Sequence, residues 1–174
     1  MRVFRLRHVH HVSLSNKHVS GYSLIEMIAT LAIISILTLM ALPYGKMIVI
    51  RNHELELQRS LREIRTAIDT FHYDWANGKH NKLEKTASSN GYPITLDILV
   101  EGVPLAGKIS ERKKYLRRLP VDPFSDQSLP VAQQWQVVGY HDEPNTSQWN
   151  GEDVYNVHSL SHRQALNKSY YRDW

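Results

Sequence analysis

Apolar residues in the first half of the chain follow two different patterns. The first is a long run over residues 22–50, within which 27–42 (MIATLAIISILTLMAL) carries no charge. Four residues interrupt the run: Glu26, Pro43, Gly45 and Lys46. At about 1.5 Å per residue, a helix of this length crosses a bilayer core of about 30 Å. Because the run is apolar on all sides, we predict a membrane-spanning helix over 22–50 and not the core helix of a soluble protein.

The second pattern is amphipathic and begins after Gly45. Six apolar residues recur at spacings of 4, 3, 4, 3 and 4, as in a helix with one apolar face. They are Leu57, Leu61, Ile64, Ile68, Phe71 and Trp75. Charged residues occupy the other faces, and Asn77-Gly78 is a typical C-cap. We therefore predict one helix from about Tyr22 to Ala76, kinked near 43–45, whose amphipathic part (51–77) packs on a small domain of the same chain.

Residues 78–174 predict that small domain. A polar loop (78–90) leads to a short helix near 96–100, a basic stretch (108–118) and the corner LPVDPF (119–124). Two short strands, 135–140 and 153–160, flank a polar loop, and the terminal ALNKSYYRDW should pack on their sheet. The expected fold class is α+β: a long N-terminal helix, half transmembrane and half amphipathic, with a small C-terminal head containing a short antiparallel sheet.

Charge is concentrated before the apolar run. Four of the 21 lysines and arginines, and no acid, lie in residues 1–21, so the rest of the chain carries 17 basic and 17 acidic residues. This balance argues against a nucleic-acid partner. The positive-inside rule keeps residues 1–21 in the cytoplasm and places the head across the membrane. A cleaved secretory signal fits less well, because Leu39 stands where a small residue should precede a cut after Ala41.

No residue pattern indicates catalysis. The chain has no cysteine, which excludes disulfides, thiol chemistry and cysteine metal sites. His8, His10 and His11 cluster in the basic leader, and the acids at 142, 143, 152 and 153 flank one loop without an EF-hand spacing. The basic group at 112–118 is typical of a soluble face. We expect no enzyme, no cofactor and no metal site.

The N-terminal motif GYSLIEM (21–27), followed by the apolar run, resembles the class III signal of type IV pilins and type II secretion pseudopilins. GYPIT (91–95) and YLRRLPVDPF (115–124) are similar to the loop and corner after the helix in the G-type major pseudopilin. VYNVHSL (154–160) and the terminal RDW resemble the end of that group. Three departures are Tyr22, where phenylalanine is usual, a long leader of 21 residues, and the C-terminal stretch 161–174, whose one acid, Asp173, does not provide the family's calcium-binding pair.

The resemblance implies a processing site and an assembly residue. A prepilin peptidase would cut between Gly21 and Tyr22, remove residues 1–21 and methylate the new amino terminus. Glu26 would then be the fifth residue of the mature chain, and its buried carboxylate would pair with the Tyr22 amine of the next subunit. Pro43, 21 residues after Tyr22, stands where the family keeps a helix-breaking proline, and with Gly45 it would allow local unwinding.

The function that follows is a structural subunit of the pseudopilus of a type II secretion system. Its expected partners are copies of itself, other pseudopilins, the prepilin peptidase and the inner-membrane platform of the system. It would be stored in the bacterial inner membrane as a single-pass protein with its head in the periplasm. Two alternatives stay open: a minor or adhesive type IV pilin, and a membrane-anchored periplasmic binding module that does not polymerise.

Overall fold

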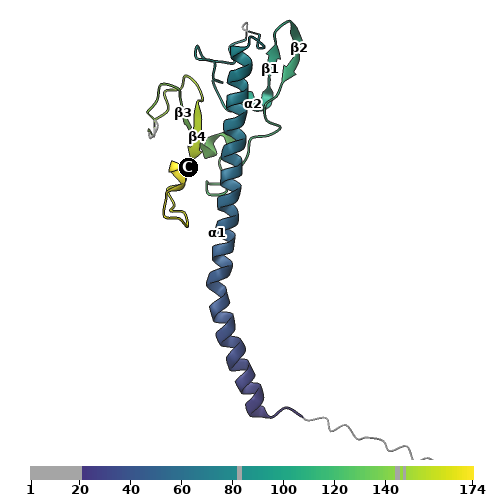
Figure 1. Ribbon diagram of the computed structural model, residues 1–174, viewed down its shortest axis with the longest axis vertical. Helices are drawn as coiled ribbons and strands as arrows, with labels where there is room; N and C mark the ends of the chain where they lie inside the picture. The colour runs from purple at the N-terminus through teal and green to yellow at the C-terminus, as the bar shows by residue number, and fades with distance from the viewer. Residues whose placement is uncertain (1–20, 82–83, 144–145, 147) are drawn as a thin grey trace, which may run out of the picture. The chain divides into compact units, whose positions relative to one another are not determined.

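The computed structural model describes residues 21–81, 84–143, 146 and 148–174 (Figure 1). The chain divides into two compact units, Met1–Pro43 and Tyr44–Trp174, and we describe each by itself. The predicted leader, including its histidine cluster, lies outside the described residues except for Gly21. As predicted, a long N-terminal helix precedes a small α+β head.

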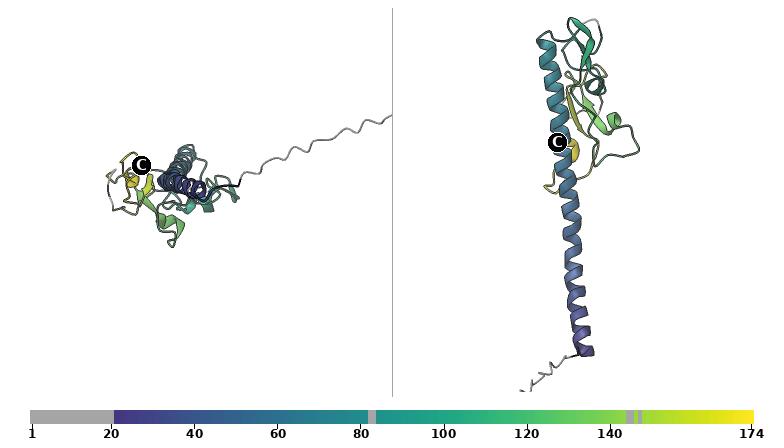
Figure 2. Two further views of the ribbon diagram at one scale, coloured as in Figure 1. Left: turned by 90° about the horizontal axis from the view of Figure 1, so that it is seen from below. Right: turned by 90° about the vertical axis from the view of Figure 1, so that its right-hand side faces the viewer.

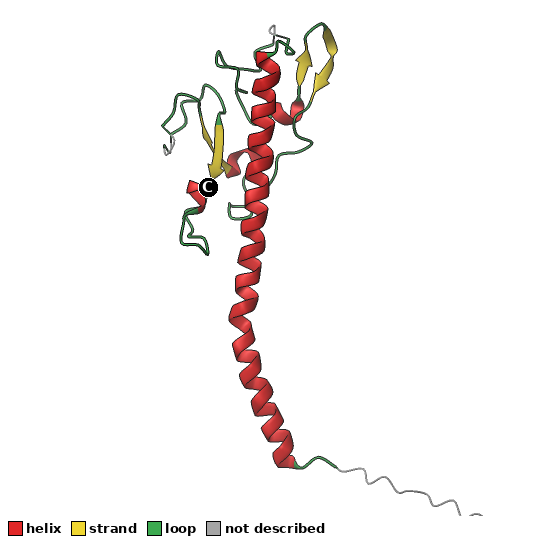
Figure 3. Cartoon of the chain, viewed as in Figure 1, coloured by secondary structure: helices red, strands yellow, loops and turns green. Residues whose placement is uncertain are grey.

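Helix α1 spans Leu24–Ala76, a total of 53 residues (Figure 3). It is helical at Pro43 and Gly45, although Pro43 has no N–H to donate to the carbonyl group one turn earlier. The local unwinding that we predict at these two residues concerns an assembled filament, and it stays a prediction. The Tyr73 carbonyl accepts a bond of 3.1 Å from the Asn77 N–H, and Gly78 follows at φ 69°, so the predicted C-cap forms.

The core of the head lies on the predicted apolar face of α1. Five of its six residues are at most 3% exposed, and Trp75 is partly buried. Those five are Leu57, Leu61, Ile64, Ile68 and Phe71. Figure 2 shows the loops and strands of the head packed along this part of α1. Their apolar side chains, among them Leu99, Val103, Val157 and Tyr171, complete the core.

Two antiparallel strand pairs lie on different sides of α1 in Figure 1. Strands β3 (Trp135–Val138) and β4 (Asn156–Ser159) lie within the two predicted strands, 135–140 and 153–160. They pair antiparallel, with Trp135 opposite Ser159 and Val138 opposite Asn156. The second pair, β1 (Val103–Leu105) and β2 (Lys108–Lys113), was not predicted. The sequence of β2, KISERK, has only one apolar residue, so it lacks the alternation that identifies a strand.

The remaining elements are short. Helix α2 covers Ile98–Glu101, close to its predicted place, and ends at Gly102, whose N–H donates to the Ile98 carbonyl at 2.9 Å. Two 3-10 turns, η1 (Val131–Gln134) and η2 (Tyr171–Asp173), precede β3 and close the chain. As expected, the terminal segment packs on the sheet, because η2 contacts β4 and Tyr171 is buried.

Buried polar groups, which the sequence pattern did not identify, fasten the head to α1. Asp74 is 1% exposed and pairs with Lys113 and, at 2.7 Å, with Lys79, while the Tyr115 hydroxyl donates to it at 3.0 Å. Burial alone would raise the pKa of Asp74, but these donors outweigh it and lower the pKa to about 2. Arg65 binds the Asn156 side chain and the Val157 carbonyl, both at 2.9 Å.

The LPVDPF corner is built around Asp122, which is fully buried. Its carboxylate accepts bonds from the Phe124 N–H at 2.8 Å and from the Ser159 hydroxyl at 2.6 Å. The Trp135 indole N–H donates to the Pro120 carbonyl at 2.9 Å. The corner therefore joins the segment after β2 to both β3 and β4, which is a structural role.

Candidate processing and assembly segment

The first described residues form a short non-helical segment before α1. The Met27 N–H donates to the Ser23 carbonyl at 3.1 Å, so Ser23 is the N-cap and Gly21, Tyr22 and Ser23 precede the helix. Tyr22 is 81% exposed. A peptidase that binds extended backbone can reach this segment without unwinding α1.

The fold itself does not require a glycine at position 21. A Cβ atom added to Gly21 would meet no atom within 4 Å, and its φ is outside the left-handed region that favours glycine. Gly91 in the head is different, because its φ is 83° and an added Cβ would overlap the Trp75 ring. Within residues 21–174 as described, the structure therefore gives no packing or backbone reason for the glycine of GYSLIEM, which agrees with recognition by another protein.

Glu26 lies in the first turn of α1 and is exposed. The partial positive charge at a helix N-terminus stabilises an acid there by roughly 0.3–1 kcal/mol. With Ser23 it also forms the S-x-x-E pattern of a capping box. Among the described residues Glu26 has no ion-pair partner. The cation that we predict for it would come from another subunit.

The large apolar side chains at the start of α1 are uncovered in the single chain. Eleven leucines, isoleucines and methionines between Leu24 and Met40 are 55–77% exposed. Burying such a side chain is worth about 1.5–3 kcal/mol, so together they represent on the order of 15–30 kcal/mol. This surface requires lipid or protein around it.

Hydroxyl groups do not interrupt the apolar surface. Thr30, Ser35 and Thr38 donate to carbonyls of their own helix, those of Met27, Leu31 and Ile34, at 2.7–2.9 Å. These polar atoms are therefore satisfied without water, as a hydrocarbon environment demands. Of the helices that the structure describes, α1 has the length and composition to cross a membrane. Its most apolar stretch is not buried by the described residues.

Comparison with known families identifies the segment. Residues 16–42 match the prokaryotic N-terminal methylation motif. The chain has a type IV pilin-like N-terminus. The match includes Gly21, Tyr22 and Glu26, and with the apolar helix it fits a membrane-anchored pilin-like protein. No curated protein and no solved structure matches the chain. The likeness to a G-type pseudopilin, the cut after Gly21 and the pairing of Glu26 stay predictions.

Two of the four acids around the 139–153 loop, Asp142 and Asp153, accept hydrogen bonds within the head. Asp142 accepts bonds from the N–H groups of Gly139 at 2.8 Å and Asn150 at 3.3 Å. Asp153 accepts from the Tyr140 N–H and the Ser88 hydroxyl, both at 2.8 Å. Within the described ranges, no three histidines, aspartates or glutamates group as metal ligands would.

The C-terminal stretch 161–174 does not fit the calcium ion that the resemblance to G-type pseudopilins implies. Its single acid, Asp173, pairs with Arg172 at 3.5 Å. A calcium site needs six to eight oxygen ligands, several of them carboxylates, and this stretch offers one carboxylate that already faces a cation.

Proposed function

We propose that this pilin-like chain is the precursor of a structural subunit of a pseudopilus, the filament of a type II protein secretion system. The observation that carries the proposal is the methylation motif at 16–42 on a helix whose apolar side chains the fold leaves uncovered. The role is structural and not catalytic. The absence of cysteine and the LPVDPF corner favour a pseudopilin over a minor or adhesive type IV pilin.

The proposed sequence of events begins in the inner membrane, with the basic leader in the cytoplasm and the head in the periplasm. The prepilin peptidase cuts between Gly21 and Tyr22 and methylates the Tyr22 amine. At the inner-membrane platform, the apolar part of α1 leaves the lipid and packs against copies of itself and other pseudopilins. Pro43 and Gly45 allow α1 to unwind locally as this happens.

Glu26 sets the register of the subunits in this proposal. A carboxylate buried without a partner costs several kcal/mol, so the assembled helices need a cation beside it. Cleavage creates one on every subunit, the amine of Tyr22. A subunit out of register would leave both charges unpaired, which makes the correct register the stable one.

Intact mass and N-terminal sequencing test the first step. In cells with an active prepilin peptidase, the chain should lose residues 1–21 and begin with a methylated Tyr22. In cells without the peptidase, it should keep its leader. A mature chain that retains residues 1–21 in the presence of the enzyme would overturn the proposal.

Replacing Glu26 with alanine tests the assembly step. Membrane insertion and cleavage should be unchanged, whereas incorporation into filaments should fall strongly. Normal incorporation would contradict the pairing role. Crosslinks between copies through residues 22–50 distinguish a filament subunit from an anchored binding module, which would give none.

A further inference from the structure

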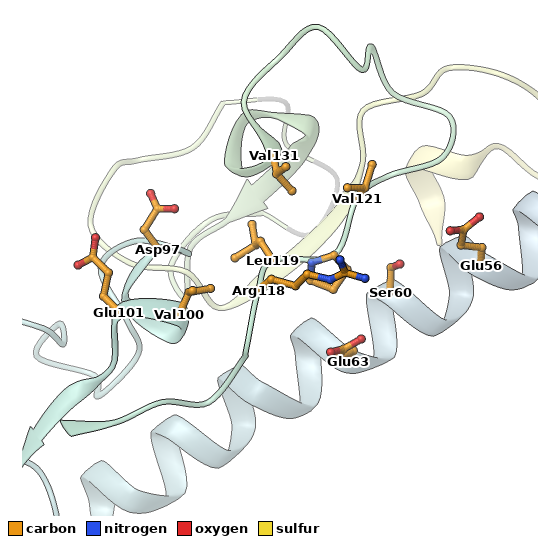
Figure 4. A pocket seen from close by; sticks show the side chains of 11 residues that line it. Glu56, Ser60, Glu63, Asp97, Val100, Glu101, Arg118, Leu119, Val121 and Val131 are labelled. Atoms are coloured by element: carbon orange, nitrogen blue, oxygen red, sulfur yellow. The ribbon is translucent and has the colours of Figure 1, made fainter. Parts of the chain in front are cut away.

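The head carries an acidic groove beside α1, with a volume of about 670 Å³ (Figure 4). Glu56 and Glu63 reach it from α1, and Asp97 and Glu101 reach it from the α2 region. Its apolar lining includes Val100, Leu119, Val121 and Val131, and its one cation is Arg118. Four carboxylates around an apolar floor fit a partner that is both cationic and apolar.

The acids of the groove form few ion pairs within the described part of the chain. Among the residues that the structure describes, Glu63, Asp97 and Glu101 have no ion-pair partner, and Glu56 has one contact of 3.7 Å with His53. Val121 on the groove wall is 41% exposed. The groove therefore has both charge and apolar surface available to a partner.

A complementary face lies on α1 itself. Arg51, Leu55 and Arg62 are spaced by 4 and 7 residues, which places them on one side of the helix. Both arginines are exposed and have no ion-pair partner within the described part of the chain. Leu55 is 45% exposed, and Leu166, which is 42% exposed, lines the same hollow beside it.

We propose that the acidic groove of one copy receives the Arg51–Leu55–Arg62 face of a second copy. Leu55 would meet the valines of the groove while the two arginines meet its carboxylates. This inference rests on the proposed function, because membrane insertion orients all copies in the same direction.

The placement of the two surfaces on α1 allows this contact to repeat. Glu56 directly follows Leu55, and Glu63 directly follows Arg62. One residue is about 100° of rotation and about 1.5 Å of rise in an α-helix, so the acids of the groove and the Arg51–Leu55–Arg62 face point about 100° apart at nearly the same height. Parallel copies can therefore pair groove to face around a common axis. In such a head-to-tail contact, a dimer still has one free groove and one free Arg51–Leu55–Arg62 face. Further copies can therefore add, which generates a ring or a helical filament.

Crosslinking between two tagged forms of the full chain tests the contact. The chain has no cysteine, so Leu55→Cys in one form and Val121→Cys in the other introduce single thiols at exposed positions. With both forms in one membrane and a short bismaleimide, we expect a mixed 55–121 product well above the 55–55 and 121–121 products. If Leu55→Cys does not accumulate, Leu166→Cys probes the same face.

Charge exchange tests why the surfaces meet. Arg62→Glu in the Leu55→Cys form should lower the mixed product about three- to fivefold, as expected when a few exposed ion pairs become repulsive. Glu63→Lys with Glu101→Lys in the other form should restore it. Lys85→Glu is the matched control, because it makes the same change of charge on an exposed residue that lines neither surface and should leave the product unchanged.

Thiols in the apolar segment, at Ile28 or Ile36, separate this inference from the proposed function. Crosslinks there without a mixed 55–121 product, or a product insensitive to charge exchange, would overturn the groove contact and leave the filament proposal intact. Absence of crosslinks at both places would contradict the filament proposal and the contact together.

Discussion

Two segments of α1 have similar apolar side chains, but one set is exposed and the other is buried. Between Leu24 and Met40, the large apolar residues are 55–77% exposed, whereas the five core residues between Leu57 and Phe71 are at most 3% exposed. The second segment has one apolar face, and the head covers it. The first is apolar on every side, and the described residues of its unit, 21–43, leave it exposed. The fold thus uses one half of the helix and leaves the other for a partner.

The largest effect should come from making one substitution in both segments. Ile64→Ala removes a fully buried side chain and should lower the free energy of unfolding of the head by about 2–5 kcal/mol. Ile36→Ala, at a side chain that is 59% exposed, should leave that free energy unchanged. Thermal unfolding of the full chain in detergent micelles measures both. Equal losses would show that the two segments do not differ as described.

Two glycines, one at the predicted cleavage site and one in the head, extend the comparison from packing to recognition by the prepilin peptidase. Gly91→Val forces a branched residue to φ 83° against the Trp75 ring and should cost the head roughly 2–4 kcal/mol. At Gly21 an added Cβ meets no described atom within 4 Å and the residue lies outside the head, so Gly21→Val should leave the head as stable as before while cleavage of the leader stops. Unfolding measurements and intact mass separate the two effects. A Gly21→Val chain that is cleaved normally would show that this glycine is not the processing mark.

The buried segment of α1 also contains Asp74, whose ionisation should make the stability of the head depend on pH in acid. Its pKa is lowered to about 2 in the folded head, so its contribution is present above its ordinary pKa of 3.8 and disappears as the pH falls towards 2. We expect a loss of about 1–2 kcal/mol over that window. Asp74→Asn should lower stability at pH 7 and flatten the acid response. Asp69→Asn, at an exposed position of the same helix, is the control and should change neither.

The smallest effect concerns His80, which is 4% exposed and shares a bond of 2.7 Å between its Nε2 and the Tyr115 hydroxyl. Burial lowers the pKa of His80, so the folded head favours the neutral ring. The free energy of unfolding therefore has its full contribution from neutral His80 above the ordinary pKa of 6.5, and it falls as the pH drops below that value. Between pH 8 and 5 the unfolding temperature should decline, and less so in His80→Gln. An identical slope in both proteins would contradict this assignment.

The sequence predicted those parts of the molecule that depend on local periodicity. The spacing of Leu57 to Phe71 identified the buried face, and the strand-like segments 135–140 and 153–160, on either side of a loop of turn formers, identified β3 and β4. It missed β2, because a charged edge strand has no apolar alternation. It also missed Asp74 and Arg65, whose partners lie far along the chain and which resemble solvated charges in the sequence. Long-range polar pairing leaves no periodic signal.

The candidate processing and assembly residues could be proposed from the sequence because they are contiguous. Gly21, Tyr22 and Glu26 lie within one short motif, and the family match covers the same stretch. The acidic groove was not predictable, since α1, the α2 region and the corner contribute to it from separate parts of the chain.

The most direct test of the central claim is mass spectrometry of polymer sheared from cells that express the full chain. The claim is that the uncovered half of α1 becomes an assembly surface after cleavage. The account predicts that this polymer contains the chain beginning at an N-methylated Tyr22. It would be contradicted by a polymer whose subunits retain residues 1–21, or by a processed chain found in membranes and never in polymer.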